Sequence, residues 1–162
     1  MRKTILSLVV SAFALCVCAA TSTPEGFTDD LDAAIAASKK SGKTVYAVFS
    51  GSDWCYWCKV LDEGYLSKKD FVKEASKKLE LVFIDRPKDK SRLSESAQKN
   101  NPALLKKYAI RGFPTVMFIA ADGTGEKAPR PGKGMSPKDY AKQLAKEAAS
   151  FAKRTKMSGK KQ

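Results

Sequence analysis

Apolar runs alternate along this chain with amphipathic stretches of helical period. Three runs of β-branched and aromatic residues carry little polarity and predict buried strands, at 44–49, 81–84 and 115–119. Apolar residues spaced three and four positions apart predict helices around these strands. The helices are expected between Thr28 and Gly42, from Cys55 with a bend near Gly64, at 68–79, at 103–108 and from Ser136 onward.

Capping and turn residues mark where several of these elements begin and end. Thr28 is the expected N-cap of the first helix, and Gly42 is its expected terminator. Ser67 is the expected cap of the helix at 68–79, which would keep Leu79 on its inward face. Asp122-Gly123 predicts a hairpin turn into a short edge strand around 125–130.

The predicted elements follow the order helix, strand, helix, strand, helix, strand, strand, helix. Strands joined through a helix are expected to be parallel, and strands joined by a hairpin antiparallel. The pattern therefore predicts an α/β fold with a central mixed β-sheet and helices on both of its faces. With 162 residues and no internal repeat, one domain is expected.

Two stretches lie outside this pattern. Residues 87–101 are polar and read as a surface excursion, helical in part over 92–99, and Pro102 suits the first turn of the next helix. Residues 155–162 are rich in lysine and are expected to form a basic flexible tail.

The first 20 residues have the pattern of a secretory signal peptide. A basic pair precedes an apolar run from Ile5 to Cys18, and small residues follow it, so that cleavage is expected after Ala19 or Ala20. Residues 21–27 would then form a short linker. The protein is expected to be exported, to the periplasm if the host is a bacterium.

Two alternatives for this segment are less favoured. An uncleaved membrane anchor would need about 20 apolar residues, and the run is shorter. A lipid anchor on Cys16 or Cys18 would need a small residue before the cysteine, whereas Leu15 and Val17 precede them.

Charge and composition exclude several kinds of site. The chain has 30 Lys and Arg, 17 Asp and Glu, and no histidine. Ser-His-Asp triads, Cys-His dyads and His-ligated metal sites are therefore excluded. The lysines are scattered over every predicted helix and most aromatics fall at strand or core positions, so no nucleic-acid partner is expected. The charge indicates a solvated surface with affinity for an anionic envelope or acidic partners.

Candidate chemistry concentrates in two cysteines. Once residues 1–20 are removed, only Cys55 and Cys58 remain. The first lies where a buried strand ends and a helix begins, so its sulfur meets the unpaired N–H groups of the helix start. In such motifs the thiol pKa typically falls to about 3.5–7.5. We expect Cys55 to attack a partner disulfide and Cys58 to resolve the mixed disulfide.

Two cysteines at this spacing can serve other purposes. Structural zinc needs four ligands and two cysteines cannot supply them, so no metal site is expected. Two thiolates could hold Cu(I) in a metal carrier. An inert disulfide in a non-catalytic binding module is a further alternative.

With these two cysteines and a second motif further along the chain, the sequence resembles the thioredoxin superfamily. The resemblance rests on Trp54-Cys55-Tyr56-Trp57-Cys58 after a strand, and on the segment from Tyr108 to Thr115 before the next strand and Asp-Gly. The stretch from Gly51 to Cys55 is similar to exported thiol:disulfide interchange proteins. The resemblance implies a thioredoxin-like domain over 28–154 and protein thiol–disulfide oxidoreductase activity.

The resemblance also implies roles for individual residues. Pro114 would follow a cis peptide bond beside the cysteines, and the backbone of Phe113 would pair with an extended substrate segment. Trp54 would flank this surface, and Tyr56 and Trp57 would offer a platform to partners. No cofactor beyond the redox disulfide is implied. The expected partners are disulfide- or dithiol-containing proteins and a membrane redox protein, and a monomer is expected.

Two departures from the family bear on mechanism. The family often has a buried acid six positions before the first cysteine, where this chain has Phe49. Asp53, Asp62 or Glu63 could accept the proton of Cys58 instead, if geometry allows. The absence of histidine between the cysteines disfavours a strong oxidant, which favours the reducing direction.

Overall fold

The computed structural model describes residues 22–159. The expected signal peptide, with Cys16 and Cys18, lies outside the described residues. The elements in chain order are α1 (Leu31–Ser41), β1 (Thr44–Ser50), α2 (Tyr56–Leu61), the π-helical turn η1 (Asp62–Leu66), α3 (Lys69–Ala75), β2 (Leu79–Asp85), the 3₁₀ turn η2 (Lys90–Arg92), α4 (Glu95–Lys107), β3 (Thr115–Ile119), β4 (Gly125–Lys127) and α5 (Pro137–Gly159).

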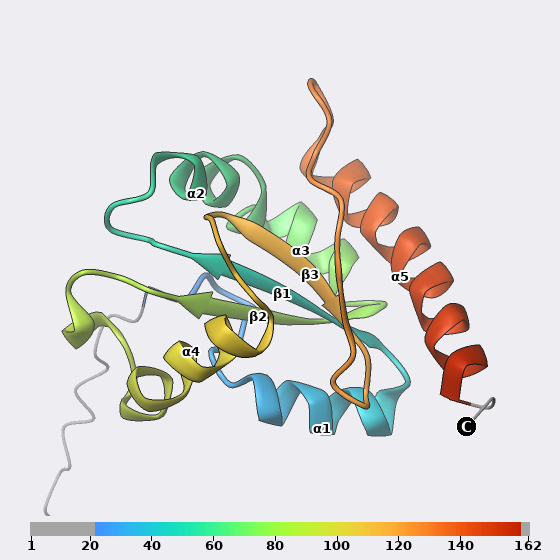
Figure 1. The fold of residues 1–162 in the computed structure, drawn as a ribbon. Coiled ribbons are helices and arrows are strands. Elements are labelled where there is room, and N and C mark those ends of the chain that lie inside the picture. Colours follow the sequence, from blue (N-terminus) through green and yellow to red (C-terminus); the bar gives the residue numbers. More distant parts are fainter. Residues whose placement is uncertain (1–21, 160–162) are drawn as a thin grey trace, which may run out of the picture.

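The four strands form one mixed sheet in the order β2-β1-β3-β4. β1 runs parallel to β2, antiparallel to β3, and β3 runs antiparallel to β4. Helices cover both faces of this sheet (Figure 1). The predicted α/β class, the order of elements and the strand directions are confirmed.

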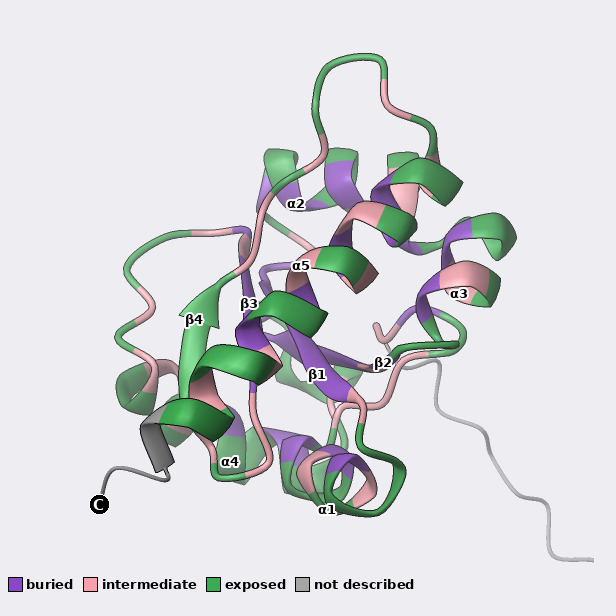
Figure 2. Cartoon of the chain, turned by 90° about the vertical axis from the view of Figure 1, so that its right-hand side faces the viewer, coloured by how far each residue is buried: buried purple, intermediate pink, exposed green. Residues whose placement is uncertain are grey.

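Every residue of the central strand β1 is buried (Figure 2). Because successive strand residues point to opposite faces, β1 contributes to two apolar layers. Tyr46 and Val48 pack with residues of α3 and α5, whereas Val45 and Phe49 pack with α1 and residues near the end of α4. This double burial explains why β1 reads as a continuous apolar run.

The start of the domain differs from the prediction. Asp30, not Thr28, is the N-cap of α1, since its carboxylate accepts the N–H of Ala33 at 2.9 Å. Thr28 instead lies beside β2 as an isolated parallel bridge to Val82. The backbone of Thr28 is thereby used for sheet pairing, and the N-cap lies two residues further on, at Asp30. Gly42 terminates α1 in the left-handed region, as expected.

The boundary between α3 and β2 was also misplaced. Ser67 is not a side-chain cap of α3, which begins after Lys68, and the helix ends at Ala75. Leu79 is the first residue of β2, where it pairs with Thr44. Strand pairing with β1 therefore extends β2 two residues towards its N-terminus relative to the apolar run. The bend expected near Gly64 is the π-helical turn.

Residues 95–107 form one helix, α4, where a polar excursion and a separate short helix were predicted. The side chain of Ser94 caps it by accepting the N–H of Ala97 at 3.2 Å. The side chain of Asn101 is buried and donates to the carbonyl of Asp85 at 2.8 Å, which ties the middle of α4 to β2. This tertiary contact carries the helix through Pro102, although proline removes one helical hydrogen bond.

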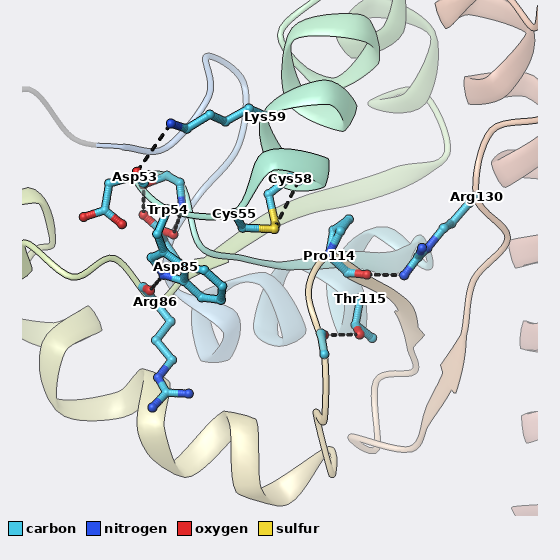
Figure 3. Close-up of a disulfide and its surroundings, with 12 residues drawn as sticks. Asp53, Trp54, Cys55, Cys58, Lys59, Asp85, Arg86, Pro114, Thr115 and Arg130 are labelled. Atoms are coloured by element: carbon cyan, nitrogen blue, oxygen red, sulfur yellow. Dashed lines mark hydrogen bonds between the residues drawn. A yellow bond between two sulfur atoms is a disulfide. The ribbon is translucent and has the colours of Figure 1, made fainter.

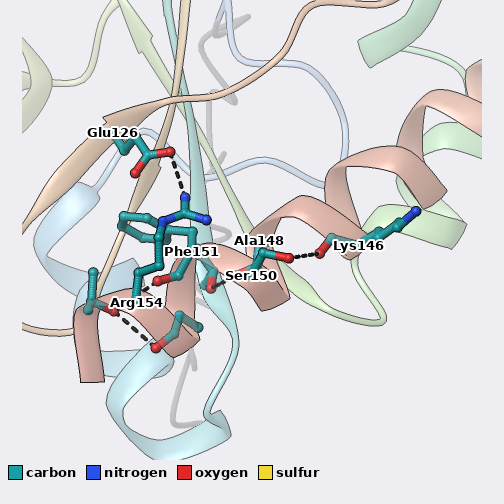
Figure 4. Close-up of polar contacts among 9 residues, drawn as sticks. Glu126, Lys146, Ala148, Ser150, Phe151 and Arg154 are labelled. Atoms are coloured by element: carbon teal, nitrogen blue, oxygen red, sulfur yellow. Dashed lines mark hydrogen bonds and ion pairs between the residues drawn. The ribbon is translucent and has the colours of Figure 1, made fainter. Parts of the chain in front are cut away.

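The last helix extends further than predicted. α5 begins after Ser136 as expected, but continues to Gly159, so residues 155–159 of the predicted tail are helical. Phe151 is buried beneath this end, and Arg154 forms an ion pair of 2.7 Å with Glu126 of β4 (Figure 4). These contacts anchor the last turns to the sheet. Residues 160–162 lie outside the described part.

The edge strand β4 covers only three residues, which is shorter than the predicted 125–130. The turn that precedes it is the expected one, with Gly123 at φ 85° and the carboxylate of Asp122 accepting the N–H of Thr124 at 2.8 Å. Within residues 22–159, no helix is long and apolar enough to cross a membrane.

Candidate functional site

Cys55 and Cys58 form a disulfide at the start of α2, after the loop that follows β1 (Figure 3). Cys55 is the N-cap of α2, and its Sγ accepts the backbone N–H of Cys58 at 3.2 Å. Cys55 is 7% exposed and Cys58 2% exposed. An incoming group can therefore approach Cys55 more readily than Cys58.

The loop before Cys55 is held by a buried carboxylate that sequence reasoning missed. Asp85, the last residue of β2, is 2% exposed and accepts the N–H and the hydroxyl of Ser52 at 2.9 and 2.6 Å. The N–H of Cys55 also donates to the carbonyl of Gly51 at 2.8 Å. An acid at the end of a buried strand was the available signal, because the carboxyl ends of parallel strands meet at one edge of the sheet.

Asp53 holds a second loop against the site. Its carboxylate accepts the backbone N–H groups of Lys88 and Asp89 at 2.9 to 3.0 Å. The hydrogen bond from Asp89 is the largest cause that lowers the pKa of Asp53. The ionised carboxylate therefore ties the segment after β2 to the loop that carries Trp54 and Cys55.

The position six residues before Cys55 contains no acid. Phe49 is fully buried there and packs against Tyr108 at 6.0 Å between ring centroids. Of the acids predicted to take the proton of Cys58, Asp62 lies one helical turn after it and is half-buried, while Glu63 is exposed.

The environment of Asp62 raises the pKa of its carboxyl group. Burial is the main cause that raises the pKa of Asp62, the hydrogen bond from Ser67 opposes the rise, and the charges of Glu63 and Asp85 add to it. A carboxyl group whose pKa is raised accepts a proton more readily. Asp62 is thus the better placed of the acids predicted from the sequence.

Trp54 and Phe113 form an aromatic pair that bridges the two motifs. Their rings meet edge to face at 5.5 Å between centroids. The indole N–H of Trp54 donates to the carbonyl of Arg86 at 2.8 Å, and its ring lies over Gly51, where an added Cβ would come within 2.4 Å of it. Trp54 is therefore fixed on three sides, although 42% of it is exposed.

Tyr56 and Trp57 form a second aromatic pair, on the first turn of α2. The rings meet edge to face at 5.1 Å, and the two residues are 69% and 66% exposed. Val60 extends this apolar surface by one turn. These side chains project from the helix that carries the cysteines.

The peptide bond between Phe113 and Pro114 is cis. Pro114 is buried, and its carbonyl accepts a hydrogen bond from the guanidinium of Arg130, as Figure 3 shows. The hydroxyl of Thr115 donates to the carbonyl of Gly112 at 2.7 Å. Arg130 was missed because it lies 16 residues downstream of Pro114 and no local pattern links them.

The aromatic site residues predicted from the sequence thus form two separate pairs beside the disulfide. Trp54 contacts Phe113, and Tyr56 contacts Trp57, with the disulfide in the same loop and helix. No ring contact joins the first pair to the second among the residues that the structure describes.

Comparisons with known proteins agree with this geometry. Residues 31–149 match the family model of the thioredoxin-like domain. A curated relative, the disulfide bond reductase DsbH of Chlamydia pneumoniae, is 36% identical over 86 residues, which are 53% of this chain and 51% of the relative. The matched region therefore spans about half of that relative.

A solved structure titled DsbH oxidoreductase superimposes with a TM-score of 0.63 at 24% identity. The match covers 90% of this chain and 95% of the other, and it confirms the fold. With the family match extending over most of the described residues, the chain belongs to the thioredoxin-like family.

Proposed function

We propose that this protein is an exported thiol–disulfide oxidoreductase that reduces disulfides in partner proteins through Cys55 and Cys58. The observation that carries the proposal is the position of the pair. The Sγ of Cys55 caps α2 and accepts the N–H of Cys58, an interaction that favours a thiolate once the disulfide is reduced. Its greater exposure makes Cys55 the attacking sulfur.

The reaction is a pair of sulfur exchanges. The Cys55 thiolate attacks one sulfur of the partner disulfide, forms a mixed disulfide and releases the other partner sulfur as a thiolate, which takes a proton. Cys58 loses its proton and attacks the Cys55 sulfur, which releases the second partner thiol. The partner gains two electrons and two protons, and Cys55–Cys58 is left as a disulfide.

Substrate would bind along Phe113. The backbone N–H and C=O of this residue make no hydrogen bond within the part of the chain that the structure describes. They are therefore available to an extended segment of a partner, as in strand addition. Trp54 would limit the surface on one side, and Tyr56 and Trp57 would contact the body of the partner.

The direction of the redox reaction and the location of the protein are inferred from other observations. The matching curated relative is named a disulfide bond reductase, and this chain has no histidine to stabilise a strongly oxidising pair. Residues 1–20 have the pattern of a secretory signal, which supports export to the periplasm. Continued reduction then needs a dithiol donor, and we propose a membrane redox protein for this role, acting on a monomer.

Two single substitutions test the mechanism. Cys55→Ser is expected to abolish reduction of a protein disulfide, whereas Cys58→Ser should accumulate mixed disulfides with partners. Mass spectrometry of alkylated, non-reduced samples would detect the mixed disulfides. The control is the double-serine variant, which should form none.

The same variants separate the alternatives. Full disulfide reduction by the double-serine variant would contradict the mechanism. Partner binding that is unchanged in that variant, without any exchange in the parent, would instead favour a binding module. Stoichiometric Cu(I) binding by the parent with negligible exchange would favour a metal carrier.

A further inference from the structure

A groove of about 780 Å³ lies beside the active-site loop. It is bounded by Trp54, by the segment that follows β2 and by α4. This volume is in the range of protein ligand sites. Trp54 forms one wall of the groove and immediately precedes Cys55, so the groove continues the active-site surface towards α4.

The floor of the groove is apolar. Ala97 is buried, and Leu93 and Leu105 are half-buried where they line it. Pro102 adds a further apolar surface on α4. Such a floor favours the binding of an aliphatic side chain, because apolar surface of both is removed from water. A ligand that is polar throughout gains little binding free energy from it.

The rim of the groove is basic. Arg86, Lys88 and Lys90 line it and are exposed. Their side-chain nitrogens make no ion pair or hydrogen bond among the residues that the structure describes. Three acids at or beside the groove are engaged locally. Asp85, which lines it, accepts hydrogen bonds from Ser52. Asp53 binds backbone N–H groups of the loop, and Asp89 binds Ser91.

A buried asparagine also borders the groove. Asn101 lines it and is only 3% exposed. Its Nδ2 donates to the carbonyl of Asp85, which fixes the orientation of the amide, and its Oδ1 has no partner within residues 22–159. Asn101 therefore fixes α4, which forms one wall of the groove, to the end of β2.

We propose that this groove binds an acidic, extended segment of the partner protein that lies next to the partner's reacting cysteine. The inference rests on the proposed function and names the class of partner it selects. Carboxylates of the segment contact the basic rim, and an aliphatic side chain covers the apolar floor. Because Trp54 borders both sites, one extended chain can occupy the groove while its cysteine meets Cys55.

The test uses short peptides whose single cysteine is activated as a disulfide with a coloured aromatic thiol. One peptide carries Leu-Glu-Glu beside the cysteine, and matched peptides carry Leu-Gln-Gln or Leu-Lys-Lys, on either side of it. The reduced Cys55–Cys58 protein attacks the peptide sulfur and releases the coloured thiolate. The rate of this release is measured with each peptide.

The variant Arg86→Gln/Lys88→Gln/Lys90→Gln removes the rim charges. Its matched control is Lys146→Gln/Lys153→Gln/Lys156→Gln on α5, which packs on the opposite face of the sheet and loses the same three charges. We expect the parent to react about ten-fold faster with the acidic than with the neutral peptide, a gain of the size that complementary charge gives to association. The preference should disappear in the rim variant, persist in the control and decline with salt.

Each outcome is decisive. Equal rates for the acidic and neutral peptides in the parent would overturn the groove proposal and leave the proposed function intact. An acidic preference lost equally in both variants would also overturn it, because it would reflect overall charge. Failure to reduce any peptide would contradict the proposed function itself. Reversal of the preference by Arg86→Glu/Lys88→Glu/Lys90→Glu, towards the lysine peptide, would support the assignment further.

Discussion

Two aromatic pairs flank the disulfide, and they differ in how they are held. Trp54 is fixed by a hydrogen bond to the carbonyl of Arg86, by contact with Gly51 and by the ring of Phe113. Tyr56 and Trp57 contact each other and are about two-thirds exposed. The first pair is thus held in place by the surrounding structure, whereas the rings of the second pair project from the surface.

The two pairs therefore serve different purposes at the site. A fixed indole beside Cys55 presets the shape of the surface that an extended substrate meets, at little entropic cost on binding. Exposed rings on α2 can change rotamer and adapt to partners of different shape. Substitutions in each pair separate a structural role for the first pair from a role of the second pair in partner contact alone.

The largest expected contrast is between the two tryptophans. Trp54→Ala removes a hydrogen bond and the packing on Gly51 and Phe113, so it should destabilise the protein by about 2 kcal/mol. Trp57→Ala should change the free energy of unfolding by less than about 0.5 kcal/mol. Urea unfolding followed by far-UV circular dichroism measures both. Equal losses from the two variants would contradict the distinction.

Gly51 offers a more indirect way to displace the fixed ring. An alanine Cβ would lie 2.4 Å from the Trp54 ring, so Gly51→Ala should move the indole and cost about 1–2 kcal/mol. Gly64→Ala is the matched control, since nothing lies within 4 Å of the added atom. Because both changes act on one contact, Gly51→Ala/Trp54→Ala should cost less than the sum of the single variants.

Asp53 connects the loop that carries Trp54 to the segment after β2 that lines the groove. Asp53→Ala should free the N–H groups of Lys88 and Asp89 and raise their hydrogen-exchange rates several-fold, with little change in core amides. The folded pKa of Asp53 is lowered, so its contribution is present above the ordinary aspartate pKa and is lost as pH falls through the lower folded value. Protection of these two amides should therefore persist at pH 5. Loss of protection between pH 7 and 5 would contradict this role.

The smallest effect on the isolated protein is expected at the second pair. Tyr56→Ser/Trp57→Ser should leave reduction of a small synthetic disulfide within about two-fold of the parent, because these rings are exposed and hold nothing in place. Reduction of protein disulfides should slow more. A comparison of kcat/KM for both substrates measures this. A large loss with the small disulfide would mean that the pair positions the cysteines.

Local sequence patterns were sufficient for most of the fold. The apolar run of β1 and the Asp122-Gly123 turn predicted their elements because period and turn chemistry act within a few residues. Thr28, Leu79 and Pro102 were misjudged because strand pairing and the Asn101–Asp85 contact act over long separations. Propensity is a weak prior where tertiary contacts decide.

The candidate site shows the same division. The cysteine pair and the Phe113-Pro114 segment could be found from motifs, since each lies within a few residues of a strand or helix end. Arg130 could not, because it acts on a residue 16 positions away. For Asp85 the available signal was its place at the end of a buried strand, and its partner Ser52 lies 33 positions away. Asn101 likewise looked like a polar loop residue, and only the packing of α4 on β2 buries it.

The proposed function requires that Cys55 and Cys58 form a redox pair that donates electrons. Its most direct test is the reduction potential of the pair in the mature protein, by equilibration with dithiothreitol or glutathione, alkylation and mass measurement. A reductase predicts a value near or below about −230 mV, in the range of thioredoxin-like reductants. A value above about −150 mV, or a pair that does not equilibrate with these thiols, would contradict the account.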